Sequence, residues 1–417
     1  MAVISHTYAR QILDSRGIPT LEVEITLDTG SKAVSSVPSG TSLGKYEAVE
    51  LRDGDESRYF GMEVTKAIAN VNTIIGPKIA GMDPTNQTEI DQTLTNLDGT
   101  TNKSNLGANA ILGVSQAVCK AGSMIYNLHL FDYIGQKYGF RSDKFATPMV
   151  NMINGGKHGA GNLDFQEFQI IPTTVKPYPE ALRLAVEIYH QLEISLTQMN
   201  AIHSVGIEGG YAPNLFTNKD ALEIITETIK RTEYIFGKDV FLGLDIAAAH
   251  FYNEGKYQIK DRPRAISPSD LFQFYKELNE NINLFSIEDP FIEDDWKSWS
   301  QLTSDLSQNT VIVGDDFLAG NKDRVQKAIQ EKSCTAILLK PNQIGTITEA
   351  VEIVKLSKDA SWTLIISHRS GETNDDFIAD FAIGVGADYT KFGAPSRGER
   401  TSKYNRLLEI YKILNPQ

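Results

Sequence analysis

Cysteine is scarce in this 417-residue chain, and its two cysteines, Cys119 and Cys334, both lie in apolar segments. They could pair with each other, but we favour two reduced thiols in a reducing compartment. The N-terminal residues MAVISHTYARQ contain no apolar signal core, and no apolar run approaches the roughly 20 residues of a membrane span. We therefore expect a cytoplasmic protein that does not cross a membrane.

Positive charge is also in short supply. Lys and Arg number 40 against 53 Asp and Glu, which leaves a formal net charge of −13. A chain this acidic has no general attraction for nucleic acid or for anionic lipid. An anionic substrate would have to be gathered locally, by a few placed cations or by metal ions. No low-complexity segment or long linker interrupts the chain, so its domains should pack closely.

The first part of the chain predicts a mixed α+β domain. Residues 21–27 alternate apolar and polar side chains with a period of two, which is typical of a half-buried strand. Thr29 and Gly30 then turn the chain into a second strand that ends near Val37, and the small-residue loop PSGTSLG follows at 38–44. A helical pattern is clearest at 108–128. We place this domain at residues 1–138.

After about residue 140, short apolar runs alternate with amphipathic helices, for example at 179–199. This βα alternation predicts a parallel sheet. We expect an α/β fold in which residues 139–417 form a (β/α)8-type barrel and the N-terminal α+β domain caps it. The long interval between Asp245 and Glu288 contains the extra segment FYNEGKYQIKDRPR, which predicts an inserted hairpin.

An ionisable residue ends each of six successive predicted strands. The C-terminal strand ends of such a barrel meet at one mouth, where catalysis occurs. Polar residues could merely mark strand ends, but six in succession favour a single functional site. The six residues are Asp245, Glu288, Asp315, Lys340, His368 and Lys391.

Three of these residues, Asp245, Glu288 and Asp315, predict a metal site, because crowded carboxylates are costly unless a cation offsets them. Oxygen ligands favour Mg²⁺ before Ca²⁺ or Mn²⁺, and the lack of a His/Cys cluster disfavours zinc. The alternative is a salt-bridge network with Lys340 and Lys391. Lys340 is also a candidate base, which requires a pKa lowered to about 7–8. The carboxylates alone would raise that pKa, and bound Mg²⁺ would oppose them.

A series of motifs along essentially the whole chain resembles the enolase family, and most of all its archaeal-type members. A single such motif would be weak, but the full set in this order is specific. The motifs are DSRG-PT around Gly17, LRDGD (51–55), NKSNLGANAILGVS (102–115), NGGKH (154–158), QEF (166–168), EGGYAPN (208–214), SIEDP (286–290), LLKPNQIGT (338–346), SHRSGET (367–373) and RGERTSKYN (397–405).

The resemblance implies Mg²⁺-dependent, reversible dehydration of 2-phosphoglycerate, a small phosphorylated hydroxy acid, to phosphoenolpyruvate in glycolysis and gluconeogenesis. It implies two Mg²⁺ ions per site, the tighter one held by the three carboxylates and the second bound with help from Ser42. It further implies that Lys340 removes the C2 proton and that Glu208 protonates the departing C3 hydroxyl, with Glu167 beside it. A homodimer or a higher homo-oligomer is also expected.

The remaining residues carried over from the family would bind the substrate. Arg369 and Ser370 correspond to the residues that grip the phosphate, and Lys391 to the one that meets the carboxylate end. The residues expected to line the rest of the pocket are His158, Gln166 and His368.

Several positions depart from the family pattern. The family usually has Asp where Ile207 stands, Thr where Leu43 and Phe392 stand, and Asn where Ile18 stands, and it has AASEF where residues 247–251 read AAAHF. These changes are compatible with drift in a functioning enolase. The alternative is a paralogue that acts on a phosphonate or another analogue of 2-phosphoglycerate. A third possibility, a non-catalytic scaffold or surface protein, is disfavoured because the groups assigned to the chemistry are retained.

Overall fold

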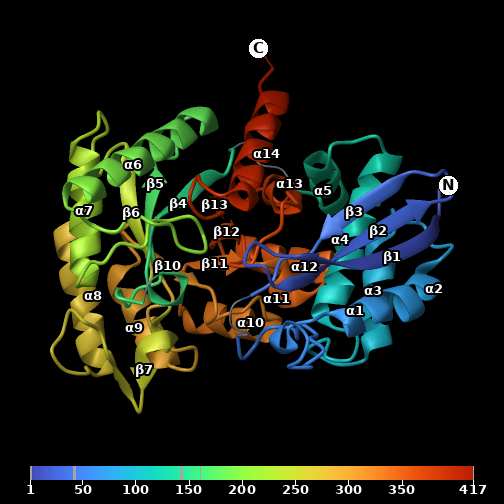
Figure 1. The fold of residues 1–417 in the computed structure, drawn as a ribbon, viewed down its shortest axis with the longest axis horizontal. Helices are drawn as coiled ribbons and strands as arrows, with labels where there is room; N and C mark the ends of the chain where they lie inside the picture. Colours follow the sequence, from blue (N-terminus) through green and yellow to red (C-terminus); the bar gives the residue numbers. More distant parts are fainter. Residues whose placement is uncertain (1, 41–43, 141–143, 160, 417) are drawn as a thin grey trace.

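The computed structural model describes residues 2–40, 44–140, 144–159 and 161–416, so Ser42 and Leu43 lie outside the described residues. The N-terminal domain contains a three-stranded antiparallel sheet in the order β1-β2-β3 (Figure 1). The second and third strands match the prediction, whereas the first was not predicted. The strands are β1 (Ile4–Leu13), β2 (Pro19–Leu27) and β3 (Lys32–Ser36).

The central helix of this domain is α4, which is buried along most of its length against β2 and β3. Gly113 allows the close approach, because a Cβ at this position would lie 2.7 Å from the side chain of Val23. The helices of the domain are η1 (Tyr59–Gly61), α1 (Thr65–Asn70), η2 (Val71–Ile75), α2 (Gly76–Ile79), α3 (Gln87–Asp98), α4 (Ala108–Ile125) and α5 (Leu130–Tyr138).

The second domain is a closed barrel with the strand order β10-β11-β12-β13-β4-β5-β6-β9. The barrel and its α/β character confirm the predicted fold class. Its strands are β4 (Thr147–Asn154), β5 (Glu167–Pro172), β6 (Val240–Asp245), β9 (Ser286–Glu288), β10 (Val311–Gly314), β11 (Ala336–Leu339), β12 (Thr363–Ser367) and β13 (Tyr389–Lys391).

One barrel strand contradicts the prediction of a parallel sheet. β5 runs antiparallel to both of its neighbours, β4 and β6, whereas the other neighbouring pairs in the barrel are parallel. The physical reason is the short connection at 155–166, which returns the chain from β4 without a crossover helix. The first residue of β5, Glu167, is therefore paired with the last residue of β6, Asp245, at the mouth of the barrel.

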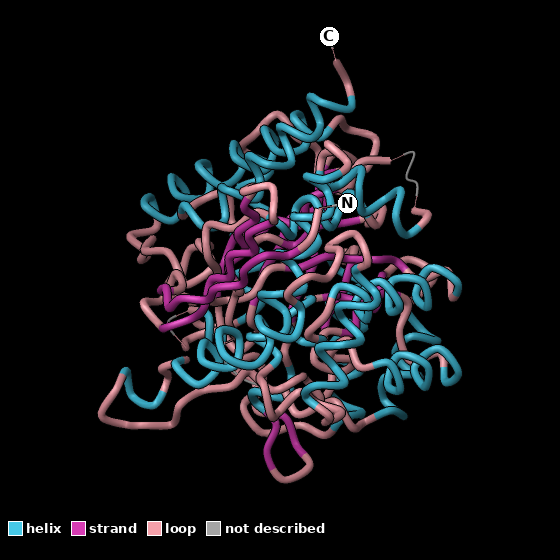
Figure 2. The backbone as a smooth tube through the Cα atoms, turned by 90° about the vertical axis from the view of Figure 1, so that its right-hand side faces the viewer, coloured by secondary structure: helices cyan, strands magenta, loops and turns pink. Residues whose placement is uncertain are grey.

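Helices follow the strands and cover the barrel. Two successive helices come after β5, and a predicted insertion, the hairpin of β7 (Tyr252–Asn253) and β8 (Lys256–Tyr257), is confirmed and projects from the molecule (Figures 1 and 2). The helices are η3 (Gly156–His158), α6 (Tyr178–Gln198), α7 (Asn218–Lys230), η4 (Ala248–Phe251), α8 (Pro268–Ile282), α9 (Trp296–Leu306), α10 (Lys322–Glu331), α11 (Pro341–Ile344), α12 (Ile347–Asp359), α13 (Phe377–Gly384) and α14 (Gly398–Leu414).

The two domains are joined by backbone contacts close to the end of β12. Ser39 and Gly371 form an isolated antiparallel bridge, and the Ser15 backbone N–H donates to the Glu372 carbonyl at 2.7 Å. The N-terminal domain thus reaches the loop that carries the predicted residues Arg369 and Ser370. Within the described residues, none of the helices has the length and apolar character needed to cross a membrane.

Candidate active site

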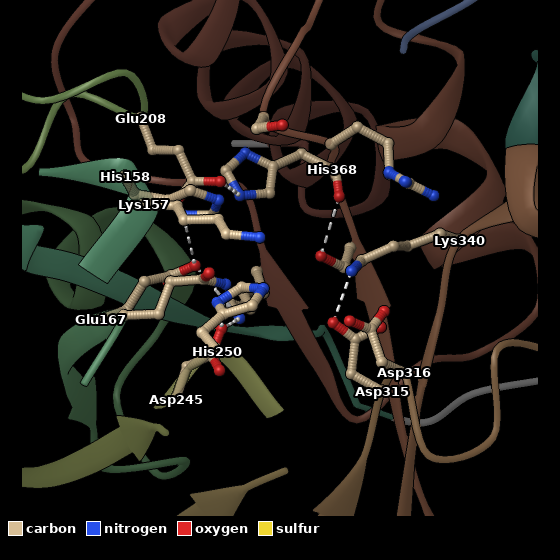
Figure 3. A pocket seen from close by; sticks show the side chains of 15 residues that line it. Lys157, His158, Glu167, Glu208, Asp245, His250, Asp315, Asp316, Lys340 and His368 are labelled. Atoms are coloured by element: carbon tan, nitrogen blue, oxygen red, sulfur yellow. Dashed lines mark hydrogen bonds and ion pairs between the residues drawn. The ribbon is translucent and has the colours of Figure 1, made fainter. Parts of the chain in front are cut away.

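A polar cavity lies at the mouth of the barrel, and charged side chains from many strand ends face into it (Figure 3). Eleven of the thirteen residues predicted for the site line this cavity. They are His158, Gln166, Glu167, Glu208, Asp245, Asp315, Lys340, His368, Arg369, Ser370 and Lys391.

Glu288, the twelfth predicted residue, does not line the cavity but is buried against Lys391, which does. The Lys391 ammonium group contacts Glu288 Oε1 at 2.8 Å, Asp245 Oδ2 at 2.9 Å and Glu167 Oε1 at 3.3 Å. Burial works against the charge on Lys391, but these carboxylates, Asp245 first, raise its pKa well above its ordinary value. The lysine therefore holds three carboxylates together as their counter-charge.

Two of the acids bound to Lys391, Asp245 and Glu288, remain hard to ionise. Burial raises the pKa of Asp245, partly opposed by Lys391, and the Gln166 amide adds a hydrogen bond to Asp245 Oδ2 at 3.3 Å. Burial and the neighbouring Asp245 carboxylate raise the pKa of Glu288 well above its ordinary value. One ammonium group does not fully offset these anions, so a further cation would stabilise the cluster.

On the opposite wall, Lys340 forms an ion pair with Asp315, with 2.5 Å between Nζ and Oδ2. Burial opposes ionisation of both groups, but Lys340 lowers the pKa of Asp315, and Asp315 raises the pKa of Lys340. This raised pKa of Lys340 agrees with the expectation from the sequence that the carboxylates alone would raise it. Two backbone N–H groups, of Asp315 and Asp316, donate to the Asp289 carboxylate at 2.9 and 2.8 Å and fix the turn that carries Asp315.

The donor set fits a hard divalent cation. Asp315 Oδ1 and Gln166 Oε1 are buried oxygens with no hydrogen-bond partner among the described residues, and such orphaned acceptors are what an oxygen-ligated ion would satisfy. Two groups of described side chains bring ligand atoms within 4.8 Å of one another, namely His158, Glu167 and Glu208, and Asp289, Asp315 and Asp316. The predicted triad of Asp245, Glu288 and Asp315 is not one of these groups. Lys391 contacts Asp245 and Glu288, and Lys340 contacts Asp315.

Glu208 lies across the cavity from Lys340, on the loop between α6 and α7 (Figure 3). The next residue, Gly209, has φ +87°, and a Cβ there would lie 2.9 Å from the Ser396 carbonyl oxygen, so glycine is required for this close turn. His158 Nδ1 lies 3.2 Å from Glu208 Oε2 and 3.8 Å from Glu167 Oε1.

The charges of His158, Glu208 and Glu167 determine which of these side chains carries a proton. Burial disfavours the imidazolium form of His158, but Glu208 and Glu167 outweigh it and raise the pKa of His158 to about 9. Burial likewise disfavours ionised Glu208, but His158 lowers the pKa of Glu208 well below its ordinary value. In the substrate-free protein, the transferable proton of this pair therefore resides on the imidazole of His158.

His368 completes this wall in its neutral form. Burial and the adjacent Arg400 lower the pKa of His368 well below its ordinary value. Arg400 lies 2.8 Å from His368 Nδ1, and a guanidinium can only donate, so Nδ1 accepts and the proton lies on Nε2. This Nε2 faces Glu208 Oε1 at 3.5 Å.

Four residues line the cavity that the sequence did not single out as functional: Lys157, His250, Asp316 and Ser367. Signals existed for three of them, since Lys157 precedes His158 in NGGKH, Ser367 begins SHRSGET and His250 lies in the departing AAAHF segment. Burial and Lys157 lower the pKa of His250 to about 4, so it is neutral at pH 7. Burial and Asp315 raise the pKa of Asp316 to about 7.

The departures from the family pattern lie mostly outside the cavity. Ile207 and Phe392 do not line it: the Ile207 carbonyl accepts from Arg400 at 3.2 Å, and Phe392 is fully buried against Tyr404. Ile18 lies in the turn between β1 and β2, where its N–H donates to Asp14. Among the departures within the described residues, His250 is the one that faces the cavity.

Comparison with known protein families agrees with the two-domain fold. Residues 4–134 match the family described as the enolase N-terminal domain. Residues 143–416 match the enolase C-terminal TIM barrel domain. The two matches together span nearly the whole chain, and the order of the domains is the one seen in the structure. The chain therefore belongs to the enolase family.

Proposed function

We propose that this protein catalyses the Mg²⁺-dependent, reversible dehydration of 2-phosphoglycerate to phosphoenolpyruvate. The observation that carries the proposal is the placement of Lys340 and Glu208 on opposite walls of one cavity, with several cationic side chains around it (Figure 3). Removal of a proton from one carbon and of hydroxide from the next requires a base and an acid in such an arrangement.

Lys340 is the proposed base for the C2 proton. A proton next to a carboxylate is very weakly acidic, and its removal places two negative charges on the carboxylate. Bound Mg²⁺, held by Asp245, Glu288 and Asp315 with Ser42 proposed for a second ion, would stabilise that charge. A cation at Asp315 would also weaken the hold of this carboxylate on the Lys340 proton, so that Lys340 could act in its neutral form.

The group of Glu208, His158 and Glu167 is proposed to assist the departing C3 hydroxyl. Hydroxide is a poor leaving group and needs a proton as the bond to carbon breaks. The proton held by His158 lies beside Glu208, which supports delivery through this carboxyl group. Neutral His368 directs its Nε2–H toward Glu208 Oε1 at 3.5 Å, a distance at which the structure has no hydrogen bond between them.

Different residues of the cavity are proposed to bind different parts of the substrate. Arg369 and Ser370, on the loop after β12, are proposed to bind the phosphate. Lys391, at the end of β13, is proposed to meet the carboxylate end, and Gln166 and His158 would line the remaining wall. An acidic chain with a net charge of −13 needs such a local concentration of positive charge to attract a trianion.

The direct test is the formation of phosphoenolpyruvate from 2-phosphoglycerate in Mg²⁺. Rapid turnover would support the proposal and exclude both a non-catalytic scaffold and a paralogue specific for another substrate. No turnover by the folded, Mg²⁺-supplied protein would refute it. The family further suggests a role in glycolysis and gluconeogenesis and a homodimer or a larger homo-oligomer, and sedimentation analysis would test the assembly.

A further inference from the structure

A buried ion pair connects the N-terminal domain to the proposed phosphate-binding arginine. Arg369 Nη1 donates to Glu47 Oε2 at 2.8 Å, and Nη2 donates to Glu47 Oε1 at 3.4 Å. The side chains of Arg369 and Glu47 are only 6% and 3% exposed. Both oxygens of one carboxylate thus hold both terminal nitrogens of the guanidinium, which is the geometry that fixes an arginine most strongly.

Glu47 contacts Arg369 without itself lining the cavity. Arg369 lines the proposed substrate cavity, whereas Glu47 lines a separate cleft between the two domains and is absent from the cavity wall. The carboxylate is itself held in place, since the Gly44 backbone N–H donates to Glu47 Oε1 at 2.9 Å. Asn342 Oδ1 accepts a further, longer hydrogen bond from Arg369 at 3.4 Å.

We propose that Glu47 is a positioning residue, which orients the Arg369 guanidinium so that its remaining donors meet the phosphoryl group of the substrate. The inference rests on the proposed function for the role of Arg369. A guanidinium has five N–H donors in a rigid fork, so binding on one edge leaves donors on another. A long side chain held in its working orientation loses less rotamer freedom when the ligand arrives.

Two other roles for Glu47 are less consistent with the geometry. Glu47 could instead occupy the place of the phosphate and leave before the substrate binds. Such a carboxylate would line the cavity, and Glu47 does not. A carboxylate that only fastens the domains together would not distinguish ligands that have a phosphoryl group from those that lack one. This last difference provides the test.

The experiment compares three variants with the wild type: Glu47→Gln, Glu47→Asp and, as a matched control, Glu349→Gln. Glu349 also forms an ion pair across the domains, with Lys103 Nζ at 2.9 Å, and it lines the same cleft without contacting Arg369. Calorimetry in saturating Mg²⁺ measures the apparent affinity for 2-phosphoglycerate, which an active variant brings to equilibrium with phosphoenolpyruvate, and the affinity for D-glycerate, the same hydroxy acid without the phosphoryl group.

Glu47→Gln should weaken binding of 2-phosphoglycerate by about 10–100-fold, the usual effect of removing a residue that orients a ligand-binding group, while D-glycerate affinity stays within about threefold. Glu47→Asp, which keeps the charge, should recover part of the loss and provides a milder variant if Glu47→Gln folds poorly. Glu349→Gln should lower thermal stability without changing the ratio of the two affinities.

The inference is overturned if Glu47→Gln leaves 2-phosphoglycerate affinity unchanged, or weakens both ligands equally, because the pair would then have only a structural role. Tighter binding of 2-phosphoglycerate by Glu47→Gln would also overturn it, since Glu47 would then compete with the phosphate. Failure of the proposed function can be distinguished from failure of this inference. In that case the wild type itself would show equal affinity for the two ligands and no turnover.

Discussion

The buried ammonium group of Lys391 provides the sharpest test of the site's electrostatics. Lys391→Met keeps the approximate volume of the side chain but leaves Glu288, Asp245 and Glu167 without the cation that they contact at 2.8 to 3.3 Å. Removing one partner of a buried ion pair typically costs about 3–5 kcal/mol, because the other charge stays buried and unpaired. We expect a loss of this size in the free energy of unfolding at pH 8, with chelator present.

The loss should depend on pH in a defined direction. Burial already raises the pKa values of Asp245 and Glu288, and removal of Lys391 raises them further. The native variant then binds protons that the unfolded chain has released, so its stability must fall as pH rises. A proton that the native variant keeps over the whole range changes the free energy of unfolding by about 1.4 kcal/mol per pH unit, or about 3.5 kcal/mol between pH 5.5 and pH 8.

Urea unfolding followed by circular dichroism at the two pH values measures both effects. Lys230→Met, which removes the exposed ion pair of Lys230 with Glu227, is the matched control and should cost no more than about 1 kcal/mol at either pH. Added Mg²⁺ should restore part of the stability of Lys391→Met, since a divalent ion supplies the missing charge. An equal loss at both pH values would show that the carboxylates do not take up protons and would refute the reasoning.

Three further predictions concern activity. Chelation should abolish turnover and Mg²⁺ should restore it; full activity in excess chelator would contradict the metal site. Asp315→Ala should weaken Mg²⁺ binding measured by calorimetry. Lys340→Ala should abolish both exchange of the C2 hydrogen in heavy water and net dehydration. Glu208→Gln should lower the rate of dehydration by about 10²–10⁴-fold and retain exchange; the opposite pattern would show that the two roles are reversed. His250→Glu should weaken 2-phosphoglycerate affinity at least tenfold, because a pair of negative unit charges about 10 Å apart already repel by about 1–2 kcal/mol at an effective dielectric of ~20. Neutral His250→Gln should not weaken the affinity; equal effects of the two would exclude a role for charge.

The strand ends could be predicted because apolar runs that stop at an ionisable residue are local features of the sequence. Asp245, Glu288 and Lys391 end their strands, and Asp315 and Lys340 follow theirs directly. The direction of β5 could not be predicted in this way, because a strand of six residues reads the same in either orientation. Strand β1 was missed since its exposed and buried residues do not alternate cleanly.

Contacts between distant residues were harder to foresee than the site residues themselves. The sequence offered a metal site and a salt-bridge network as alternatives, and the structure shows the salt bridges, while the metal site stays a prediction. Lys391 and Lys340 neutralise the very carboxylates that are proposed to bind metal. The pairing of Glu47 with Arg369 joins residues 322 positions apart, and no local sequence pattern predicts it.

The reversed direction of β5 also affects where the chain can be engineered. Since this strand begins at the mouth, it ends at the opposite end of the barrel, and the turn at 173–177 that leads to α6 lies there, far from the catalytic groups. Val175 in this turn is 85% exposed. A peptide tag or new chain termini placed at this turn would leave the cavity untouched, whereas the corresponding position after the other barrel strands would open the active site.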